Sequence, residues 1–207
     1  MKPDLRTTDT KERVIAEAWR LYQLGGYSYL NMDHIAKTLK ITRPALYFHF
    51  PGGKDQLIVE VIKFWSAEVI KQLESAAREN QDARTRLKHI MYGVTRQPLP
   101  DDKEIVLSQL CQLSKQAQNE MHQLIIAINQ IIIGVIEEGI RNGELRQVDP
   151  NIVFISFTGL CRQVEKYPVL RQLLPQDFVN KFPDTVEEIA DKLLELWFEG
   201  IIATSTN

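Results

Sequence analysis

Residues 31–50 of the chain, NMDHIAKTLKITRPALYFHF, predict two short helices joined by a tight turn. Asn31 can cap the first helix, because its side-chain oxygen can accept hydrogen bonds from the free backbone N–H groups of the first turn. Apolar residues then recur at three- and four-residue spacing, which predicts one buried face. Thr42 can cap the second helix, and Pro44 fits its first turn, where a missing N–H costs little.

The second helix of this stretch has a polar outward face. Its inward set is Ala45, Leu46 and Phe50, and its outward set is Arg43, Tyr47 and His49. A small helix that exposes a guanidinium, a phenol and an imidazole suits the major groove of DNA. By themselves, the periodicity and the caps favour a plain helical hairpin with solvated polar residues, since such hairpins are common.

The order of residues around this stretch is more specific than its periodicity. The successive elements are Gly26-Tyr27, Asn31-Met32, Ile35-Ala36, Ile41-Thr42, the run from Ala45 to Phe50, and Lys54 with Leu57. This order resembles the DNA-binding domain of the tetracycline-repressor (TetR/AcrR) family, over about the first third of the chain. Two positions depart from the family pattern. Lys40 stands where the family usually has glycine in the turn, and Pro51-Gly52-Gly53 places Lys54 one residue farther along than the commonest form.

The resemblance implies a sequence-specific DNA-binding regulator, most often a repressor, that is released from its operator when a small ligand binds. It also implies a homodimer that binds a near-palindromic site on double-stranded DNA. Together with the outward face, it indicates base contacts from Thr42, Arg43, Pro44 and Ala45, and phosphate contacts from Asn31, Tyr47, His49 and Lys54.

The charge distribution agrees with a protein that contacts DNA at one end. The net charge is −2 over 207 residues, which alone argues against a general nucleic-acid binder. Through residue 55 the formal charge is +3, and over the remainder it is −5. A basic N-terminal part on an acidic body is the pattern expected of a DNA-binding head.

The periodicity predicts an all-α protein of about nine helices, since no strand-like alternation occurs. Two domains are expected, residues 1–53 for DNA binding and 54–207 for ligand binding and dimerisation. Outside the central stretch, five helices are predicted with both ends: Asp9 to the Gly25-Gly26 pair, Lys54 to Arg78, Ala83 to Gln97, Asn119 to Arg141, and Asp184 to Ala203. Two more are predicted by their starts alone, one at Asp101 or Asp102 and one at Asp149-Pro150. A loop containing Pro168, Pro175 and Pro183 is predicted before the last helix.

The last helix has apolar residues on more than one face. This pattern fits a helix that contacts both its own core and a twofold mate, and it fits a fully enclosed core helix equally well. The resemblance implies that the last two helices of each chain form a four-helix bundle. The predicted dimerisation residues are Val153, Phe157, Leu160, Val164, Ile189, Leu193, Trp197 and Ile201.

The middle of the chain mixes apolar residues with neutral polar ones, as an apolar ligand pocket with a few hydrogen-bonding groups would require. The candidate ligand-binding residues are Tyr92, Gln109, Gln112, Asn129, Phe157 and Cys161. Taken singly, each such residue is more often a surface amide or a core filler. Cys111 and Cys161 lie far apart without metal-ligand spacing, so neither a disulfide, a metal nor a cofactor is predicted.

The compartment and the competing functions follow from what the sequence lacks. The N-terminal residues hold no apolar signal region, and the longest apolar runs, such as Ile131 to Ile136, are too short to span a membrane. A cytoplasmic protein without a membrane partner is expected. An all-α enzyme is the second function class, but no nucleophile with a base, phosphate loop or metal set supports it. The third is a ligand-independent DNA-binding or architectural protein.

Overall fold

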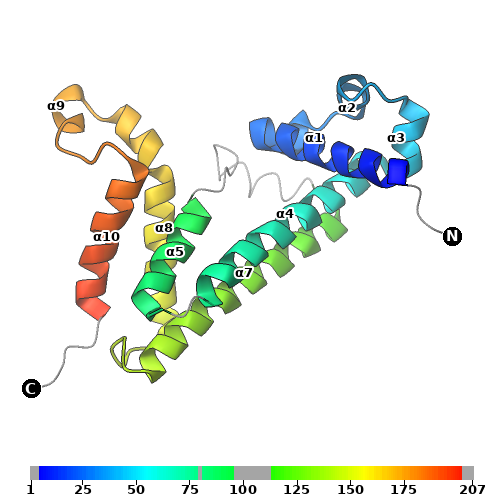
Figure 1. Ribbon diagram of the computed structural model, residues 1–207. Helices are drawn as coiled ribbons and strands as arrows, with labels where there is room; N and C mark the ends of the chain where they lie inside the picture. Colours follow the sequence, from blue (N-terminus) through cyan, green and yellow to red (C-terminus); the bar gives the residue numbers. More distant parts are fainter. Residues whose placement is uncertain (1–4, 79–80, 96–112, 202–207) are drawn as a thin grey trace, which may run out of the picture. The chain divides into compact units, whose positions relative to one another are not determined.

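The computed structural model describes residues 5–78, 81–95 and 113–201, and these contain nine helices and no strand (Figure 1). The predicted all-α fold class is therefore confirmed. The helices are α1 (Leu5–Tyr29), α2 (Met32–Thr38), α3 (Arg43–His49), α4 (Gly53–Arg78), α5 (Ala83–Thr95), α7 (Lys115–Arg141), α8 (Pro150–Leu173), α9 (Gln176–Val179) and α10 (Val186–Ile201). The helix predicted from Asp101 or Asp102 lies outside the described residues.

The chain divides into two compact units. Among the described residues, the first unit holds 5–68 and 113–126, and the second holds 69–78, 81–95 and 127–201. Helices α4 and α7 each contribute residues to both units. The predicted boundary between residues 53 and 54 separates functions, whereas the two units are separated by their internal contacts. The predicted boundary therefore stays a prediction.

In the first unit, α1 packs on α2, and α2 packs on α3. Helix α1 is also joined to α4. The indole rings of Trp19 and Trp65 stack with their centroids 5.3 Å apart, and the Lys11 ammonium pairs with the Glu60 carboxylate at 2.8 Å. Helix α1 begins at Leu5, one turn before the predicted start at Asp9. The Asp9 capping signal is therefore not used as a helix start.

The helical part of α1 breaks at the predicted glycine pair. Gly25 and Gly26 both have non-helical backbone angles, and Gly26 has φ 65° and ψ −155°. This combination lies in a region of backbone space that is essentially restricted to glycine. The break turns the chain towards α2, so Gly26 has a structural role that no residue with a side chain can fill without strain.

Replacement of Gly26 by alanine is expected to lower the free energy of unfolding by about 1–3 kcal/mol, because the backbone strain is retained in the folded state. Gly134→Ala is the matched control, since Gly134 lies within α7 and a Cβ there would meet nothing within 4 Å. The control should be neutral or stabilising by up to about 1 kcal/mol. Urea denaturation of both variants measures the difference, and equal stabilities would contradict the assignment.

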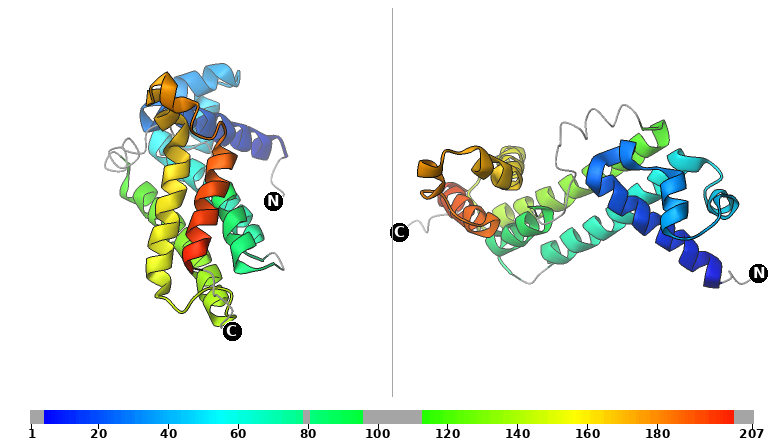
Figure 2. Two further views of the ribbon diagram at one scale, coloured as in Figure 1. Left: turned by 90° about the vertical axis from the view of Figure 1, so that its left-hand side faces the viewer. Right: turned by 90° about the horizontal axis from the view of Figure 1, so that it is seen from above.

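In the second unit, α5, α8 and α10 pack against one another, and α8 and α10 lie side by side in Figures 1 and 2. Their shared core contains Leu87, Ile90, Phe157, Leu194 and Phe198, all at most 2% exposed. This packing places the two C-terminal helices next to each other, so their remaining faces are available to other contacts.

Among the described residues of this unit, one charged side chain is buried, and it pairs with a half-exposed carboxylate. The Arg86 guanidinium, on α5, pairs with the Glu138 carboxylate of α7 at 2.8 Å. It also donates to the carbonyl of Ala77 at 3.3 Å. Hydrogen bonding to this guanidinium lowers the pKa of the Glu138 carboxyl. Because breaking such a pair leaves a buried charge uncompensated, Arg86 is best explained as a structural residue.

The predicted starts of α5 and α8 are confirmed by their caps. Asp82 accepts a hydrogen bond from the Thr85 N–H at 2.8 Å, and Asp149 accepts one from the Asn151 N–H at 2.8 Å. Helix α7 begins at Lys115 and not at the predicted Asn119. Ser114 explains the difference, because its hydroxyl accepts from a backbone N–H in the first turn of α7.

The predicted loop around Pro168 is wrong, because α8 continues through Pro168 to Leu173. A proline inside a helix loses one backbone hydrogen bond and crowds the preceding turn. Tertiary contacts of the neighbouring residue can offset this cost. The preceding residue, Tyr167, is only 4% exposed, and its hydroxyl donates to the carbonyl of Pro183 at 2.6 Å. The short helix α9 follows inside the segment that the sequence predicts as loop.

Helix α7 is longer and more apolar than its uninterrupted apolar runs suggest. It has 27 residues, and an 18-residue window of it has a mean hydropathy of 1.5. By length and composition alone, one helix among the described residues could therefore cross a membrane. Core helices of globular proteins pass the same test, so this helix by itself is weak evidence of a membrane span.

Candidate nucleic-acid interface

Helix α2 is fixed at its start by the predicted cap. The Asn31 side-chain oxygen accepts hydrogen bonds from the backbone N–H groups of Asp33 at 2.9 Å and His34 at 3.1 Å. Met32 and Ile35 are buried and attach the helix to the core of the first unit. The first turn of α2 is thus held on both sides, by hydrogen bonds outside and by packing inside.

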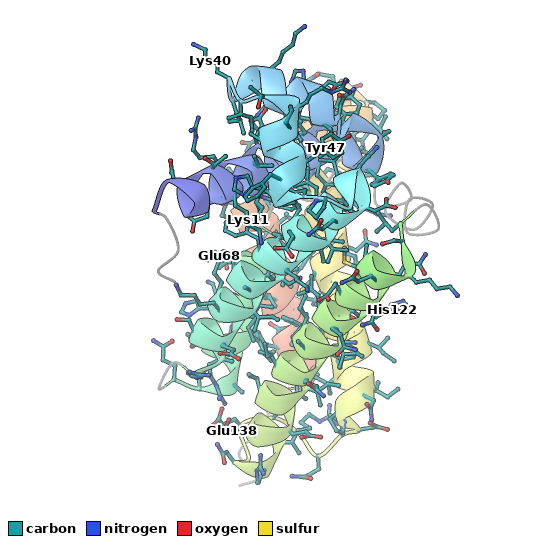
Figure 3. All side chains as sticks on the ribbon, turned by 90° about the vertical axis from the view of Figure 1, so that its right-hand side faces the viewer. Lys11, Lys40, Tyr47, Glu68, His122 and Glu138 are labelled. Carbon is teal, nitrogen blue, oxygen red and sulfur yellow. The ribbon has the colours of Figure 1, made fainter. Side chains whose placement is uncertain are left out.

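The turn after α2 has the geometry that glycine usually provides. The N–H of Lys40 donates to the carbonyl of Lys37 at 3.2 Å, and the N–H of Ile41 donates to the carbonyl of Ala36 at 3.0 Å. These two bonds form a Schellman motif. Lys40 adopts the left-handed conformation with φ 55°, which costs a non-glycine residue about 1–2 kcal/mol. The departure from the family pattern therefore leaves the turn intact, and Figure 3 shows the Lys40 side chain extending away from the ribbon.

Helix α3 begins as predicted. The Thr42 hydroxyl accepts from the backbone N–H of Ala45 at 3.3 Å, and Pro44 occupies the first turn. Leu46 and Phe50 have no exposed surface and anchor the inner face of the helix. The caps and this inner face hold a seven-residue helix that would not be stable on its own.

The outer face of α3 is more apolar than predicted. Phe48 is 76% exposed and Tyr47 is 42% exposed; Tyr47 is labelled in Figure 3. Pro44 and Phe48 are four residues apart, so they share the side of the helix opposite Leu46. His49 is half-buried, and its ring meets the Phe48 ring edge-on with centroids 5.5 Å apart. No role is predicted for Phe48 from the sequence, although its spacing from Pro44 indicates the outward face.

Arg43, the predicted base-reading residue, is held by a carboxylate on the neighbouring helix. Its Nη2 donates to Oδ2 of Asp33 at 2.7 Å, and its Nε pairs with Oδ1 of the same residue. The two side chains are 65% and 55% exposed. Nothing in the sequence indicates a part for Asp33 in the site, because the pair depends on how α2 is oriented relative to α3.

Lys54, the predicted phosphate contact, is the second residue of α4. Its ammonium lies over the Tyr27 ring, 3.9 Å from the ring centroid. The Tyr27 hydroxyl donates to the Asp55 carboxylate at 2.7 Å. The aromatic ring therefore positions a cation beside the free N–H groups of a helix N-terminus.

The electrostatics of this group favour an incoming anion. Partial burial lowers the pKa of Lys54, although the neighbouring Asp55 carboxylate opposes the shift. Burial, and then the hydrogen bond to Asp55, raise the pKa of Tyr27 to about 12. Since burial disfavours the charged ammonium, an anion placed near Lys54 would stabilise it.

The eight predicted DNA-contacting residues fall into two sets in the structure. Asn31 and Thr42 already use their side-chain oxygens as helix caps. The other six lie on or next to α3 and are exposed or half-buried: Arg43, Pro44, Ala45, Tyr47, His49 and Lys54. All eight therefore belong to one short stretch of the first unit, and their contacts with DNA stay a prediction.

The predicted ligand-binding residues lie on three different helices or outside the described residues. Gln109 and Gln112 lie outside the described residues. Phe157 and Cys161 are buried on α8, and Asn129 is half-buried on α7. The hydroxyl of Tyr92 donates to the Asp191 carboxylate at 2.5 Å, which links α5 to α10.

A surface hollow elsewhere on the second unit is lined by other residues, namely Lys71, Glu74, Ser75 and Arg78. Within the described ranges, no group of three or more histidine, cysteine or acidic side chains could hold a metal ion.

The predicted dimerisation residues divide by burial. Val153, Phe157 and Val164 are at most 3% exposed within one chain, so little of their surface is left for a partner, and their part in a dimer stays a prediction. They fill the protomer's own core because that side of α8 packs against α5 and α10. The remaining five are partly exposed: Leu160, Ile189, Leu193, Trp197 and Ile201.

Exposed apolar residues lie on the opposite side of these helices. On α8 they are Ile152, Ile155, Val169, Leu170 and Leu173, and on α10 the most exposed is Leu196. Ile152, Ile155 and Leu196 are each more than 60% exposed.

Comparison with known protein families finds two matches. Residues 14–61 match the model described as bacterial regulatory proteins, tetR family. Residues 80–166 match the model described as tetracyclin repressor-like, C-terminal domain.

Individual relatives match parts of the chain. Over 54 residues the chain is 41% identical to the HTH-type transcriptional regulator LmrA of Bacillus subtilis (strain 168). The matched segment covers 26% of this chain and 29% of LmrA. Over 191 residues the chain is 22% identical to the uncharacterized HTH-type transcriptional regulator YuxN of the same organism, covering 88% of this chain and 65% of YuxN. The chain thus spans less than two thirds of the length of either relative.

Solved structures share the fold over nearly the whole chain. The transcriptional regulator FadR from Bacillus subtilis, in complex with stearoyl-CoA, matches with a TM-score of 0.67 and 18% identity, covering 91% of this chain and 98% of FadR. AibR, in complex with isovaleryl coenzyme A and operator DNA, matches with a TM-score of 0.66 and 22% identity, covering 90% of this chain and 96% of AibR. At these identities the likeness concerns the fold. Because models of one family match both its N-terminal and its C-terminal part, the chain belongs to the tetR family of bacterial regulatory proteins.

Proposed function

We propose that this protein is a cytoplasmic, sequence-specific DNA-binding transcriptional regulator that needs no cofactor. The observation that carries the proposal is the capped α2–turn–α3 pair, whose second helix is anchored by Leu46 and Phe50 and exposes its other face. A helix held in this way can enter the major groove while the preceding helix supports it. Family membership supports the same function.

Each side chain of the interface has a proposed role. Thr42 to Ala45 lie at the N-terminal end of α3 and contact base edges, with Arg43 donating to guanine. Asn31, Tyr47, His49 and Lys54 contact phosphates. The exposed apolar pair Pro44 and Phe48 can contact the methyl groups of thymine, which the major groove presents.

Lys54→Ala is expected to weaken binding to all DNA sequences alike and to reduce the slope of log K against log salt by about one per half-site, because one phosphate contact is lost. Lys71→Ala is the matched control, since Lys71 is an exposed lysine farther along α4. Fluorescence anisotropy over a salt series measures both variants. If Lys54→Ala left the affinity and the slope unchanged, the phosphate contact would have to be withdrawn.

We propose that the protein acts as a homodimer through α8 and α10. The exposed apolar residues on these helices support this, because patches of that kind mark interaction surfaces. A twofold dimer places two α3 helices against successive major grooves, about 34–36 Å apart, and therefore recognises a near-palindromic operator.

We propose further that the protein is a repressor, released when a small, largely apolar effector binds the second unit. FadR and AibR, which share the fold, were solved with acyl-CoA molecules bound, and AibR also with operator DNA. Tyr92, Asn129, Phe157 and Cys161 are the candidate ligand contacts among the described residues, together with Gln109 and Gln112 outside them. Acyl-CoA thioesters are therefore the first effectors to test.

Gel-shift experiments on the DNA upstream of the protein's own gene test the proposed function. The expected result is a shift by the protein alone, reversed by an acyl-CoA or another apolar metabolite. A shift that no ligand reverses would favour the ligand-independent architectural protein. No shift with any DNA would contradict a DNA-binding function and reopen the enzyme class.

A further inference from the structure

The pair between Asp33 and Arg43 joins the two helices of the candidate interface through one edge of the guanidinium. Nε pairs with Oδ1, and Nη2 donates to Oδ2 at 2.7 Å. Two parallel bonds of this kind fix the plane of the guanidinium as well as its position. The carboxylate therefore holds Arg43 in a defined orientation, and not only near a charge.

The bonds to Asp33 leave the outer edge of Arg43 available. A guanidinium has five N–H donors, and the Asp33 carboxylate occupies the Nε–H and one N–H of Nη2. The remaining N–H of Nη2 and the N–H groups of Nη1 form the outer edge, at the end of the side chain away from Cδ. No described residue accepts a hydrogen bond from Nη1 at this position. This outer edge has two parallel donors, the arrangement that matches O6 and N7 of guanine in the major groove.

Both partners are attached to rigid parts of the fold. Asp33 lies in the first turn of α2, and its own N–H donates to the capping oxygen of Asn31 at 2.9 Å. Arg43 is the first residue of α3, directly after the Thr42 cap. The Schellman turn at Lys40 joins the two helices. The carboxylate therefore lies on a fixed support next to the arginine.

Stability does not account for the pair. Both side chains are more than half exposed, and ion pairs at such positions contribute little to folding because water and salt screen them. A lone carboxylate close to a DNA-facing helix would also repel the phosphates. Orientation of Arg43 is a role that explains why a carboxylate occupies position 33.

We propose that Asp33 is a positioning residue that holds Arg43 for a bidentate contact with guanine, and that it thereby sets the base preference of the protein. This inference rests on the proposed DNA-binding function. Asp33 reduces the number of conformations that Arg43 must give up on binding, so it favours the complex in which the outer edge of the guanidinium finds two acceptors. It also neutralises the arginine at sites where no such acceptors are present.

The experiment selects binding sites from a random DNA library, so the operator sequence need not be identified first. The proteins are the wild type, Arg43→Ala, Asp33→Asn and the double variant. Glu12→Gln is the matched control, because Glu12 is an exposed acid on α1 of the same unit and its loss changes the net charge equally. The affinity of each protein is then measured for the selected site and for a site with adenine in place of the preferred guanine.

The wild type is expected to prefer guanine at one position of each half-site, by roughly 5- to 150-fold over adenine. Arg43→Ala should lose this preference. Asp33→Asn should reduce it at the same position while binding unrelated DNA as well as the wild type or better, since a negative charge is removed. The double variant should match Arg43→Ala, and Glu12→Gln should keep the guanine preference. Thermal unfolding of each variant shows that the fold is retained.

Several results would overturn the inference. If Asp33→Asn kept the full guanine preference and only shifted all affinities, as Glu12→Gln should, Asp33 would act by charge alone. A stronger guanine preference in Asp33→Asn would mean that the carboxylate masks Arg43. If Arg43→Ala kept the selected motif, the guanine contact would be absent while DNA binding still stood. A wild-type protein that selected no motif would instead contradict the proposed function itself.

Discussion

A double variant with Ile155→Glu and Leu196→Glu is expected to be monomeric and to bind operator DNA roughly 10²- to 10⁴-fold more weakly than the wild type, as loss of a linked second site predicts. In one chain Ile155 is 62% exposed and Leu196 is 68% exposed, so glutamate at these positions meets no obstacle in the isolated protomer. In the proposed dimer the same carboxylates would be buried without partners, which is strongly unfavourable. The variant should therefore fold normally and fail only in assembly.

Sedimentation velocity gives the oligomeric state, and a gel shift gives the affinity. The matched control replaces Ile125 and Ile126 of α7 by glutamate, because these residues are 45% and 47% exposed but belong to the other unit. The control should remain dimeric. If the Ile155 and Leu196 variant also stayed dimeric, the exposed faces of α8 and α10 would have no part in the dimer.

Three of the residues that the sequence predicts for this interface would make a poorer test. Substitution of Phe157 or Val164 would disrupt the protomer's own core, because neither side chain is exposed. Trp197 is half-buried, and its indole N–H donates to the Ser156 hydroxyl at 3.0 Å. A loss of assembly in such variants could not be distinguished from a loss of folding.

Prediction from the sequence succeeds where the signals are local. The caps at Asn31, Thr42 and Asp149 are each satisfied by backbone N–H groups two or three residues away. The prediction that the long helix runs from Lys54 to Arg78 differs from the observed α4 by one residue at its start. Such features depend on a few neighbouring side chains, and those can be read in order along the chain.

Prediction fails where the outcome depends on contacts between distant parts. Helix α8 continues through Pro168 next to the buried Tyr167, whose hydroxyl is bonded to Pro183, and no local signal predicts these contacts. The apolar periodicity of α8 indicates that one face is buried, but not which element covers it. The same holds for the Asp33–Arg43 pair, whose partners lie ten residues apart on different helices.

Effector binding is expected to lower the affinity for operator DNA about 5- to 150-fold, which corresponds to a coupling of roughly 1–3 kcal/mol. Helix α4 is the proposed link, because it is one continuous helix from Gly53 to Arg78 and contributes to both compact units. Its first turn carries Lys54, the proposed phosphate contact. A ligand that shifts the other end of α4 would move Lys54, and the two recognition helices of a dimer would no longer match the spacing of the half-sites.

The contacts of the second unit show what a ligand at the proposed site would have to displace. Tyr92 is hydrogen-bonded to Asp191, and Phe157 packs against Trp197 with ring centroids 5.5 Å apart. A ligand that inserts near these residues must break or rearrange these contacts. It can change DNA binding only by the difference between its affinities for the two arrangements.

Tyr92→Phe, which removes the bond to Asp191, should therefore change the ligand concentration needed for release.

Linkage makes this coupling measurable from either side. If an effector weakens DNA binding by a given factor, operator DNA must weaken effector binding by the same factor. Isothermal titration of the effector into the free protein and into the protein–operator complex gives the effector affinity without and with DNA. A scrambled DNA of equal length is the control. Equal effector affinity in both titrations would mean that the second unit does not regulate the first. The first unit would then bind DNA independently of any ligand, as an architectural protein would, and α4 would be a connection without a switch.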